Sequence, residues 1–272
     1  MTLSLARLDL HRAQSLDDAL QALHDAPRMV IAGATDVYVA LNAGTMAAHR
    51  FLDIGALDEL REIAIRDDHL VIGALVTYAA LIASPLVHEW LPMLCDAART
   101  VGGPQIQNRG TIGGNVANGS PAGDTLPVLA ASDAMLRLRC LDAERCVPLT
   151  RFYSGYRTTV MRPDELIVSV EVPRVLGSQW FRKVGTRAAL AISKTVIAAI
   201  GGTSPRIAVG SVAPTVVRLW ATERVLARGG TIDDAIAALR TEIHPIDDLR
   251  STADYRLRVT ENLVRRFWSE HA

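Results

Sequence analysis

Glycine and asparagine are concentrated in one stretch of the chain, Gln107–Asp124, which has the sequence QNRGTIGGNVANGSPAGD. The Gly113-Gly114 pair allows a backbone to approach a ligand closely, and its successive N–H groups can form an anion-binding nest. Thr111 and the amide that follows the glycine pair can add hydrogen bonds, and Asp124 can accept one from a hydroxyl-bearing group such as a ribose. We expect a helix-free binding loop between Gly102 and Gly123. The alternative is a long structural loop in which Asp124 only caps the next helix.

A second, shorter glycine loop lies at Val30–Val37, with the sequence VIAGATDV. An apolar run ends at Gly33, and a helix is expected to begin at Thr35. Backbone N–H groups would then point outward at a helix N-terminus, which suits a phosphate. The alternative is a tight turn between a strand and a helix, with Thr35 as an ordinary N-cap.

Other motifs that would carry chemistry are absent from the sequence. There is no dinucleotide fingerprint after a strand, no Walker A loop and no nucleophile elbow. The seven histidines are scattered, without the spacing of a zinc site. Cys95, Cys140 and Cys146 fit neither a disulfide framework nor a metal cluster, so we expect inert thiols in a reducing cytoplasm. We therefore name no catalytic residue and no metal ligand.

Short strands and helices must position the two loops, and their pattern predicts an α+β protein in three blocks, 1–57, 58–173 and 174–272. The first block is predicted to be a small β-α-β unit, with a helix that starts at Ser15. The strands predicted along the chain are 28–32, 51–54, 70–75, 135–140, 166–173, 179–184 and 206–212. The helices predicted are 16–23, 35–43, 78–84, 86–100, 126–131, 222–227, 232–239 and 255–268, while 188–200 is ambiguous between helix and strand.

The composition excludes several classes of protein. Of the 272 residues, 49% are apolar, and 29 basic residues balance 29 acidic ones. This zero net charge argues against a dedicated nucleic-acid binder. No stretch approaches the 18 uninterrupted apolar residues of a membrane span, and the N-terminus lacks the apolar region of a signal peptide. We expect a cytoplasmic, globular protein.

The segment Gln105–Asp124 resembles, almost residue for residue, a motif of the FAD-binding (medium) subunits of the xanthine dehydrogenase/carbon monoxide dehydrogenase family of molybdenum hydroxylases. The first loop resembles the family's other FAD loop, in which a second glycine often stands where this chain has Ala34. Later segments also match, among them FYSGYR at 152–157 and the Tyr255-Arg256 pair. The resemblance covers nearly the whole chain.

This resemblance implies a fold and a cofactor site. The fold would be the FAD-binding fold of the vanillyl-alcohol oxidase/p-cresol methylhydroxylase type, with two α/β subdomains, followed by a C-terminal α+β domain of a small sheet and helices. The FAD pyrophosphate would lie between the two loops. For Lys183 the alternative is an ordinary solvated lysine in a strand. The FAD contacts implied are Val30, Ile31, Ala32, Gly33, Ala34, Thr35, Asp36, Val37, Val101, Gly102, Thr111, Ile112, Gly113, Gly114, Asn115, Asp124, Ile167 and Lys183.

The resemblance also implies a function and partners. Such chains are electron-transfer subunits that take electrons from [2Fe–2S] clusters of an iron–sulfur subunit, while another subunit holds the molybdenum cofactor. They pass the electrons from FAD to NAD⁺ or another acceptor. The cysteines of this chain are too few and wrongly spaced to hold the clusters. A free-standing FAD oxidase of the same fold and a regulatory subunit that has lost FAD stay open as alternatives.

Overall fold

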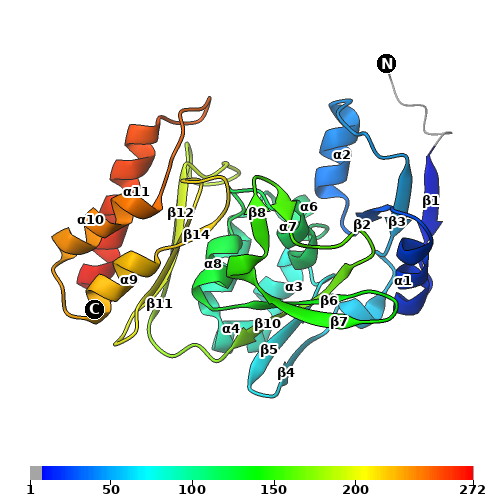
Figure 1. Cartoon of the computed structure of the whole chain (residues 1–272), viewed down its shortest axis with the longest axis horizontal. Coiled ribbons are helices and arrows are strands. Elements are labelled where there is room, and N and C mark those ends of the chain that lie inside the picture. Colours follow the sequence, from blue (N-terminus) through cyan, green and yellow to red (C-terminus); the bar gives the residue numbers. More distant parts are fainter. Residues whose placement is uncertain (1–7, 272) are drawn as a thin grey trace.

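The computed structural model describes residues 8–271, and three main β-sheets follow one another along the chain (Figure 1). The N-terminal sheet lies at one end of the molecule, and the C-terminal sheet with α9, α10 and α11 lies at the other. Helices and strands occur throughout, as the predicted α+β class requires. The domain boundaries at 57 and 173 stay a prediction.

The N-terminal sheet is a parallel unit in the order β1-β3-β2. The Ser15 hydroxyl accepts a hydrogen bond from the backbone N–H of Asp18 and so begins α1, as predicted. Leu20 and Leu23 on one face of this helix are buried beneath the sheet. The elements are β1 (Asp9–Arg12), α1 (Leu16–Asp25), β2 (Met29–Ile31), α2 (Thr35–Asn42) and β3 (Arg50–Asp53).

The central sheet is antiparallel, in the order β4-β5-β10-β6-β7. Residues of its middle strand, β10, alternate between two cores: Val170 and Val172 join the main core, whereas Leu166 and Val168 join the core of the N-terminal unit. The strand therefore ties the two units together. The strands are β4 (Ile63–Arg66), β5 (His69–Gly73), β6 (Met135–Arg139), β7 (Glu144–Pro148) and β10 (Leu166–Pro173), with a small hairpin of β8 (Tyr153–Gly155) and β9 (Thr158–Thr159).

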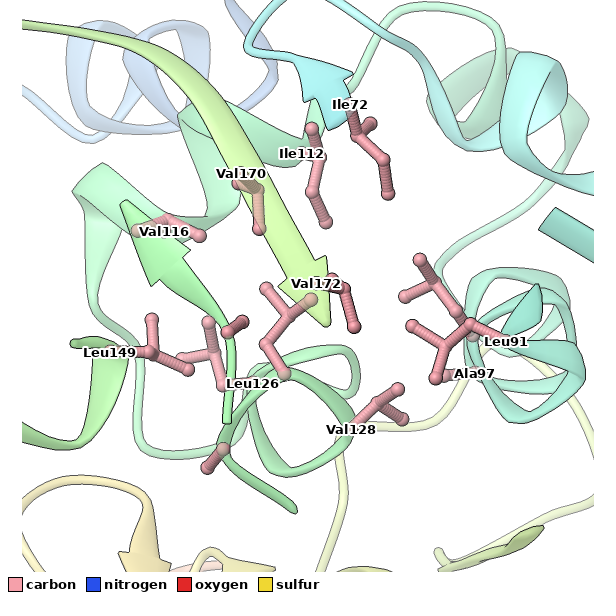
Figure 2. Packing of buried hydrophobic residues seen from close by; sticks show 14 of the residues in the cluster. Ile72, Leu91, Ala97, Ile112, Val116, Leu126, Val128, Leu149, Val170 and Val172 are labelled. Carbon is pink, nitrogen blue, oxygen red and sulfur yellow. The ribbon is translucent and has the colours of Figure 1, made fainter. Parts of the chain in front are cut away.

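Helices of this central part pack against the sheet and form the main core, part of which Figure 2 shows. Ile72 and Val170 of the sheet face Ile112 and Val116 of α7, and Val128 of α8 lies near the same cluster. The helices are η2 (Asp58–Leu60), α3 (Tyr78–Ala83), α4 (Pro85–Trp90), α5 (Pro92–Arg99), α6 (Pro104–Gln107), α7 (Ile112–Asn118), α8 (Leu126–Ala131) and η3 (Leu149–Arg151).

The C-terminal sheet is buried on both faces. Along β12, Val196 and Ala198 belong to the main core, whereas Ile197 and Ala199 belong to a second core beneath the last three helices. All six residues of β12 are buried, which removes the polar alternation typical of a surface strand and explains why 188–200 was ambiguous in the sequence. The elements are β11 (Gln179–Val184), β12 (Thr195–Ile200), β13 (Arg206–Gly210), β14 (Val217–Arg218), α9 (Trp220–Ala227), α10 (Ile232–Glu242) and α11 (Ala253–His271).

Two sequence-based expectations about helices are wrong. The helix predicted at 86–100 is two helices, because Pro92 cannot continue α4 and instead starts α5. Asp124 does not cap α8, whose N-cap is Thr125. Within residues 8–271, no helix, α11 included, has an apolar stretch that could cross a bilayer.

Candidate functional site

The two glycine loops meet in the structure. Asn118 Nδ2 donates a hydrogen bond to Asp36 Oδ1 (3.0 Å) and so joins positions 82 residues apart. Gly33 packs so closely on Arg109 that a Cβ atom built on this glycine would lie 1.7 Å from the Arg109 carbonyl oxygen. Glycine at position 33 is therefore required by the contact between the loops.

The first loop leads into α2 with a set of unpartnered backbone N–H groups. Ala34 is the N-cap, adopts the left-handed φ of 63°, and makes no side-chain capping bond. In the described part of the chain, the N–H groups of residues 33–37 donate no hydrogen bond. Together with the helix dipole, such groups at the N-terminus of this eight-residue helix favour an anion. The alternative in which Thr35 caps the helix is wrong, since Thr35 is its first residue.

The second loop is helical, so the expectation of a helix-free segment between Gly102 and Gly123 is wrong. The N–H group of Gly113 donates to the Ala74 carbonyl oxygen (2.9 Å), and that of Gly114 donates to Thr111 Oγ1 (3.1 Å). The N–H groups that were expected to form an anion-binding nest therefore already donate hydrogen bonds within the protein. A Cβ atom on Gly113 would lie 2.7 Å from the Ala74 oxygen, so this glycine allows α7 to pack closely on the residue that follows β5.

A cavity of about 630 Å³ lies where the two loops meet, which is in the usual range for ligand sites. Residues 33–37 at the start of α2 line this cavity, and so do residues of the first turn of α7. Of the predicted contacts, those that line the cavity are Val30, Ala32, Gly33, Ala34, Thr35, Asp36, Val37, Thr111, Gly113, Gly114, Asn115 and Ile167.

The other predicted contacts lie outside the lining of this cavity: Ile31, Val101, Gly102, Ile112, Asp124 and Lys183. Ile112 is fully buried and packs in the main core. Gly102 follows α5 with φ 53° and lies against Ile106. Lys183 lines a separate hollow beside the end of α5.

Asp124 and Lys183 form a buried ion pair. Lys183 Nζ donates to Asp124 Oδ2 (2.6 Å) and to the Thr100 carbonyl oxygen (3.0 Å), while the Ser193 hydroxyl donates to Asp124 Oδ1. The alternative of Lys183 as a solvated strand residue is wrong, because its side chain is 11% exposed. Burial raises the pKa of Asp124, although Lys183 and Ser193 act in the opposite direction. Each carboxylate oxygen accepts one hydrogen bond from the protein, and the second lone pair of each stays available for the ribose contact expected of Asp124.

Sequence reasoning missed four polar residues on the cavity lining, Thr45, Tyr78, Asn118 and Arg157. Tyr78 is almost fully buried; desolvation raises the pKa of its phenol, and the charges of Asp36 and Asp124 add to that effect. The signal for Asn118 was its place within the Gly- and Asn-rich segment. No local pattern marked Tyr78, which comes to the cavity through the hydrogen bond from its backbone N–H to the Gly110 carbonyl oxygen (3.2 Å).

Family models match the chain along most of its length. Residues 6–175 match the FAD binding domain in molybdopterin dehydrogenase, and residues 181–271 match the CO dehydrogenase flavoprotein C-terminal domain. The chain belongs to the family of FAD-binding subunits of molybdenum-dependent dehydrogenases. This FAD subunit is a part of oxidoreductases of the xanthine/CO dehydrogenase type, as its resemblance in the sequence implied.

Individual relatives agree with this assignment. The FAD subunit is 32% identical to the putative xanthine dehydrogenase FAD-binding subunit of Escherichia coli K12, over 96% of this chain and 94% of the relative. It is 31% identical to the carbon monoxide dehydrogenase medium chain of Hydrogenophaga pseudoflava, over 96% and 95% of the two chains. A solved carbon monoxide dehydrogenase from the same organism matches with a TM-score of 0.91 and 28% identity, covering 98% of this chain and 99% of that one.

Proposed function

We propose that this FAD subunit carries electrons from [2Fe–2S] clusters of an iron–sulfur partner, through FAD, to NAD⁺ or another acceptor, within a complex whose third subunit holds the molybdenum cofactor. The observation that carries the proposal is the cavity between the two loops, which is lined by five consecutive residues, 33–37, whose N–H groups donate no hydrogen bond within the described chain. These groups fit a pyrophosphate, because each can donate to an anionic oxygen and the helix dipole adds to the attraction. Bound FAD supplies the one- and two-electron chemistry.

The residues of this chain would bind and orient the cofactor rather than transfer protons. Asn118 holds Asp36 in place, so the first turn of α2 is fixed against α7. Tyr78 stays protonated because burial raises its pKa, and its hydroxyl can donate a hydrogen bond within the cavity. A free-standing oxidase would need a general base over the flavin. Among the lining residues, Asp36 accepts a hydrogen bond from Asn118, and the Tyr78 phenol is hard to ionise because burial raises its pKa.

The free thiols of Cys95, Cys140 and Cys146 fit the proposed cytoplasmic location, where disulfides are rare. The substrate that the complex would oxidise is left open by this chain, because its relatives include subunits named for xanthine, carbon monoxide and glyceraldehyde. The proposal for this chain is therefore one of electron transfer, and the substrate belongs to the partner.

A substitution at Thr35 tests the phosphate site. Thr35→Glu places a carboxylate at the first residue of α2, where the helix dipole stabilises it, so folding is preserved while a phosphate is repelled. We expect FAD affinity, measured by quenching of flavin fluorescence, to fall about a hundred-fold, the order expected of like charges at close range. The matched control Thr35→Gln, of similar size and uncharged, should bind within a few-fold of the wild type.

The proposal is wrong about this site if the Glu and Gln variants bind FAD equally well. Replacement of Gly113 would be a poorer test, because a side chain there meets Ala74 directly and disturbs the fold whether or not FAD binds nearby.

A further inference from the structure

The Tyr255-Arg256 pair near the C-terminus takes no part in the cavity, yet Arg256 is held in an unusual way. Its side chain, on the first turns of α11, is 4% exposed. One guanidinium nitrogen donates to the carbonyl oxygens of Lys194 (2.9 Å) and Ser211 (2.7 Å), and another donates to Asp248 Oδ1 (2.7 Å). A buried guanidinium that donates to two carbonyl groups of different segments fixes both segments relative to the helix.

Both of these segments lead to Asp124. The Ser211 hydroxyl donates to the Ser193 carbonyl oxygen (3.1 Å), and Ser211 itself adopts the left-handed φ of 66°, which a non-glycine residue keeps only where its surroundings impose it. The Ser193 hydroxyl in turn donates to Asp124 Oδ1. Ser193 is thus held from two sides, through Ser211 and through its neighbour Lys194, by the same arginine.

We propose that Arg256 is a positioning residue for the cofactor site, which acts through Ser193 to hold the Asp124 carboxylate against Lys183. The inference rests on the proposed FAD site and on the cofactor contacts that the sequence resemblance implies for Asp124 and Lys183; the charge of Asp124 acts on Tyr78, which lines the cavity. A side chain on the last helix of the C-terminal domain thereby orients an ion pair that joins the segment just before α8 to β11. The C-terminal domain would in this way help to build the FAD site.

The alternative is that Arg256 only stabilises the C-terminal domain. The two accounts differ in the role of Asp124. If Arg256 acts on FAD binding through Asp124, replacing Arg256 should not change FAD affinity further once Asp124 has been replaced. If Arg256 acts only on stability, the effects of the two replacements on FAD binding should be additive.

The test is a double-mutant cycle on the full chain, with the dissociation constant of FAD as the readout. Arg256→Lys keeps the positive charge, but its one nitrogen cannot reach acceptors that two guanidinium nitrogens now serve, and Ser193→Ala removes the hydroxyl that donates to Asp124 Oδ1. Arg258→Lys is the matched control, because the Arg258 side chain lies on the same helix, is 77% exposed and pairs only with Asp254. The cycle is completed by Asp124→Asn alone and in combination with each variant.

We expect Arg256→Lys and Ser193→Ala each to weaken FAD binding about ten-fold, the usual effect of losing one hydrogen bond to a charged group. In the Asp124→Asn background neither should weaken it further, and Arg258→Lys should have no effect. Bound flavin in Ser193→Ala should also show a shifted midpoint potential. Equal losses with and without Asp124, or no loss in the wild-type background, would overturn the inference.

Failure of the underlying cofactor assignment gives a different result. In that case Asp124→Asn itself leaves FAD binding unchanged, while the Thr35 variants still report on the phosphate site. If Arg256→Lys does not fold, Ser193→Ala carries the test alone, since it deletes only one oxygen atom from a well-packed position.

Discussion

At the scale of single residues, the site depends on a strained alanine. Ala34 is the N-cap of α2 and has a φ of 63°, a conformation that costs a residue with a Cβ about 1–2 kcal/mol relative to glycine. The family motif often has glycine at this position. The strained residue and the residues that follow it, 35–37, all line the cavity.

Ala34→Gly should therefore stabilise the apoprotein by about 1 kcal/mol, less the entropy cost of a more flexible unfolded chain. Urea unfolding followed by circular dichroism measures the change. Ala40→Gly, in the interior of the same helix, is the control and should destabilise by a similar amount. Destabilisation by both substitutions would show that residue 34 is not strained.

At the scale of elements, the site is made by the contact between two loops that are far apart in the sequence. The hydrogen bond between Asp36 and Asn118 joins the start of α2 to the end of α7, and the close approach of Gly33 to Arg109 joins it to the segment before α7. Each loop is ordered by its own helix, but the cavity exists only where they meet.

Gly33→Ala should separate the loops, because its Cβ would overlap the Arg109 carbonyl group. We expect FAD affinity to fall more than ten-fold, together with a loss of stability of about 1–3 kcal/mol, the usual cost of overpacking. Fluorescence titration and thermal unfolding measure the two effects. Gly155→Ala is the control, because a Cβ atom there meets no other atom within 4 Å; a neutral effect at both positions would contradict the predicted contact.

How much the sequence predicts also differs between elements. The helix start at Ser15 and the strands around β5, β10 and β11 were predicted correctly, because capping and apolar patterns are local signals. The edge strand β4 and the strand β7 were missed, since their exposed residues carry little pattern. The helix α7 was hidden by glycine and asparagine, whose weak helix propensity is overridden by packing against β10. The helix α6 is only four residues long and has no buried residue that would mark it.

The same limit applies to the site. The two loops and their proximity followed from motif and resemblance, and most of the predicted contacts line the cavity. What the sequence could not reveal is which N–H groups are free, because the donors of Gly113 and Gly114 are used by Ala74 and Thr111. The pair Asp124–Lys183 and its link to Arg256 are also contacts between distant segments.

At the scale of the whole molecule, the three sheets share their cores. β10 contributes to both the N-terminal and the main core, and β12 contributes to both the main and the C-terminal core. If one of these strands is displaced, it leaves both of the cores to which it contributes, and apolar residues of both become exposed. We therefore expect the described domains to unfold as one unit.

Ile197→Ala tests this cooperativity, because Ile197 is fully buried on the face of β12 that points to the last helices, away from the cavity. The substitution should lower the free energy of unfolding by about 2–4 kcal/mol, because it leaves a cavity in the core. Release of flavin, followed by fluorescence, and loss of helical circular dichroism should move together to the same lower temperature. If flavin is released at the wild-type temperature while part of the helical circular dichroism is lost at a lower temperature, the domains unfold independently.

The central claim is that the cofactor phosphates bind at the start of α2 and not at the start of α7. Amide proton shifts of ¹⁵N-labelled chain, recorded with and without FAD or ADP, test it most directly. The account predicts large downfield shifts for residues 33–37 with both ligands, because their N–H groups gain charged acceptors, and small shifts for Gly113 and Gly114, whose donors are already engaged. Large shifts at the two glycines and none at residues 33–37 would contradict the account.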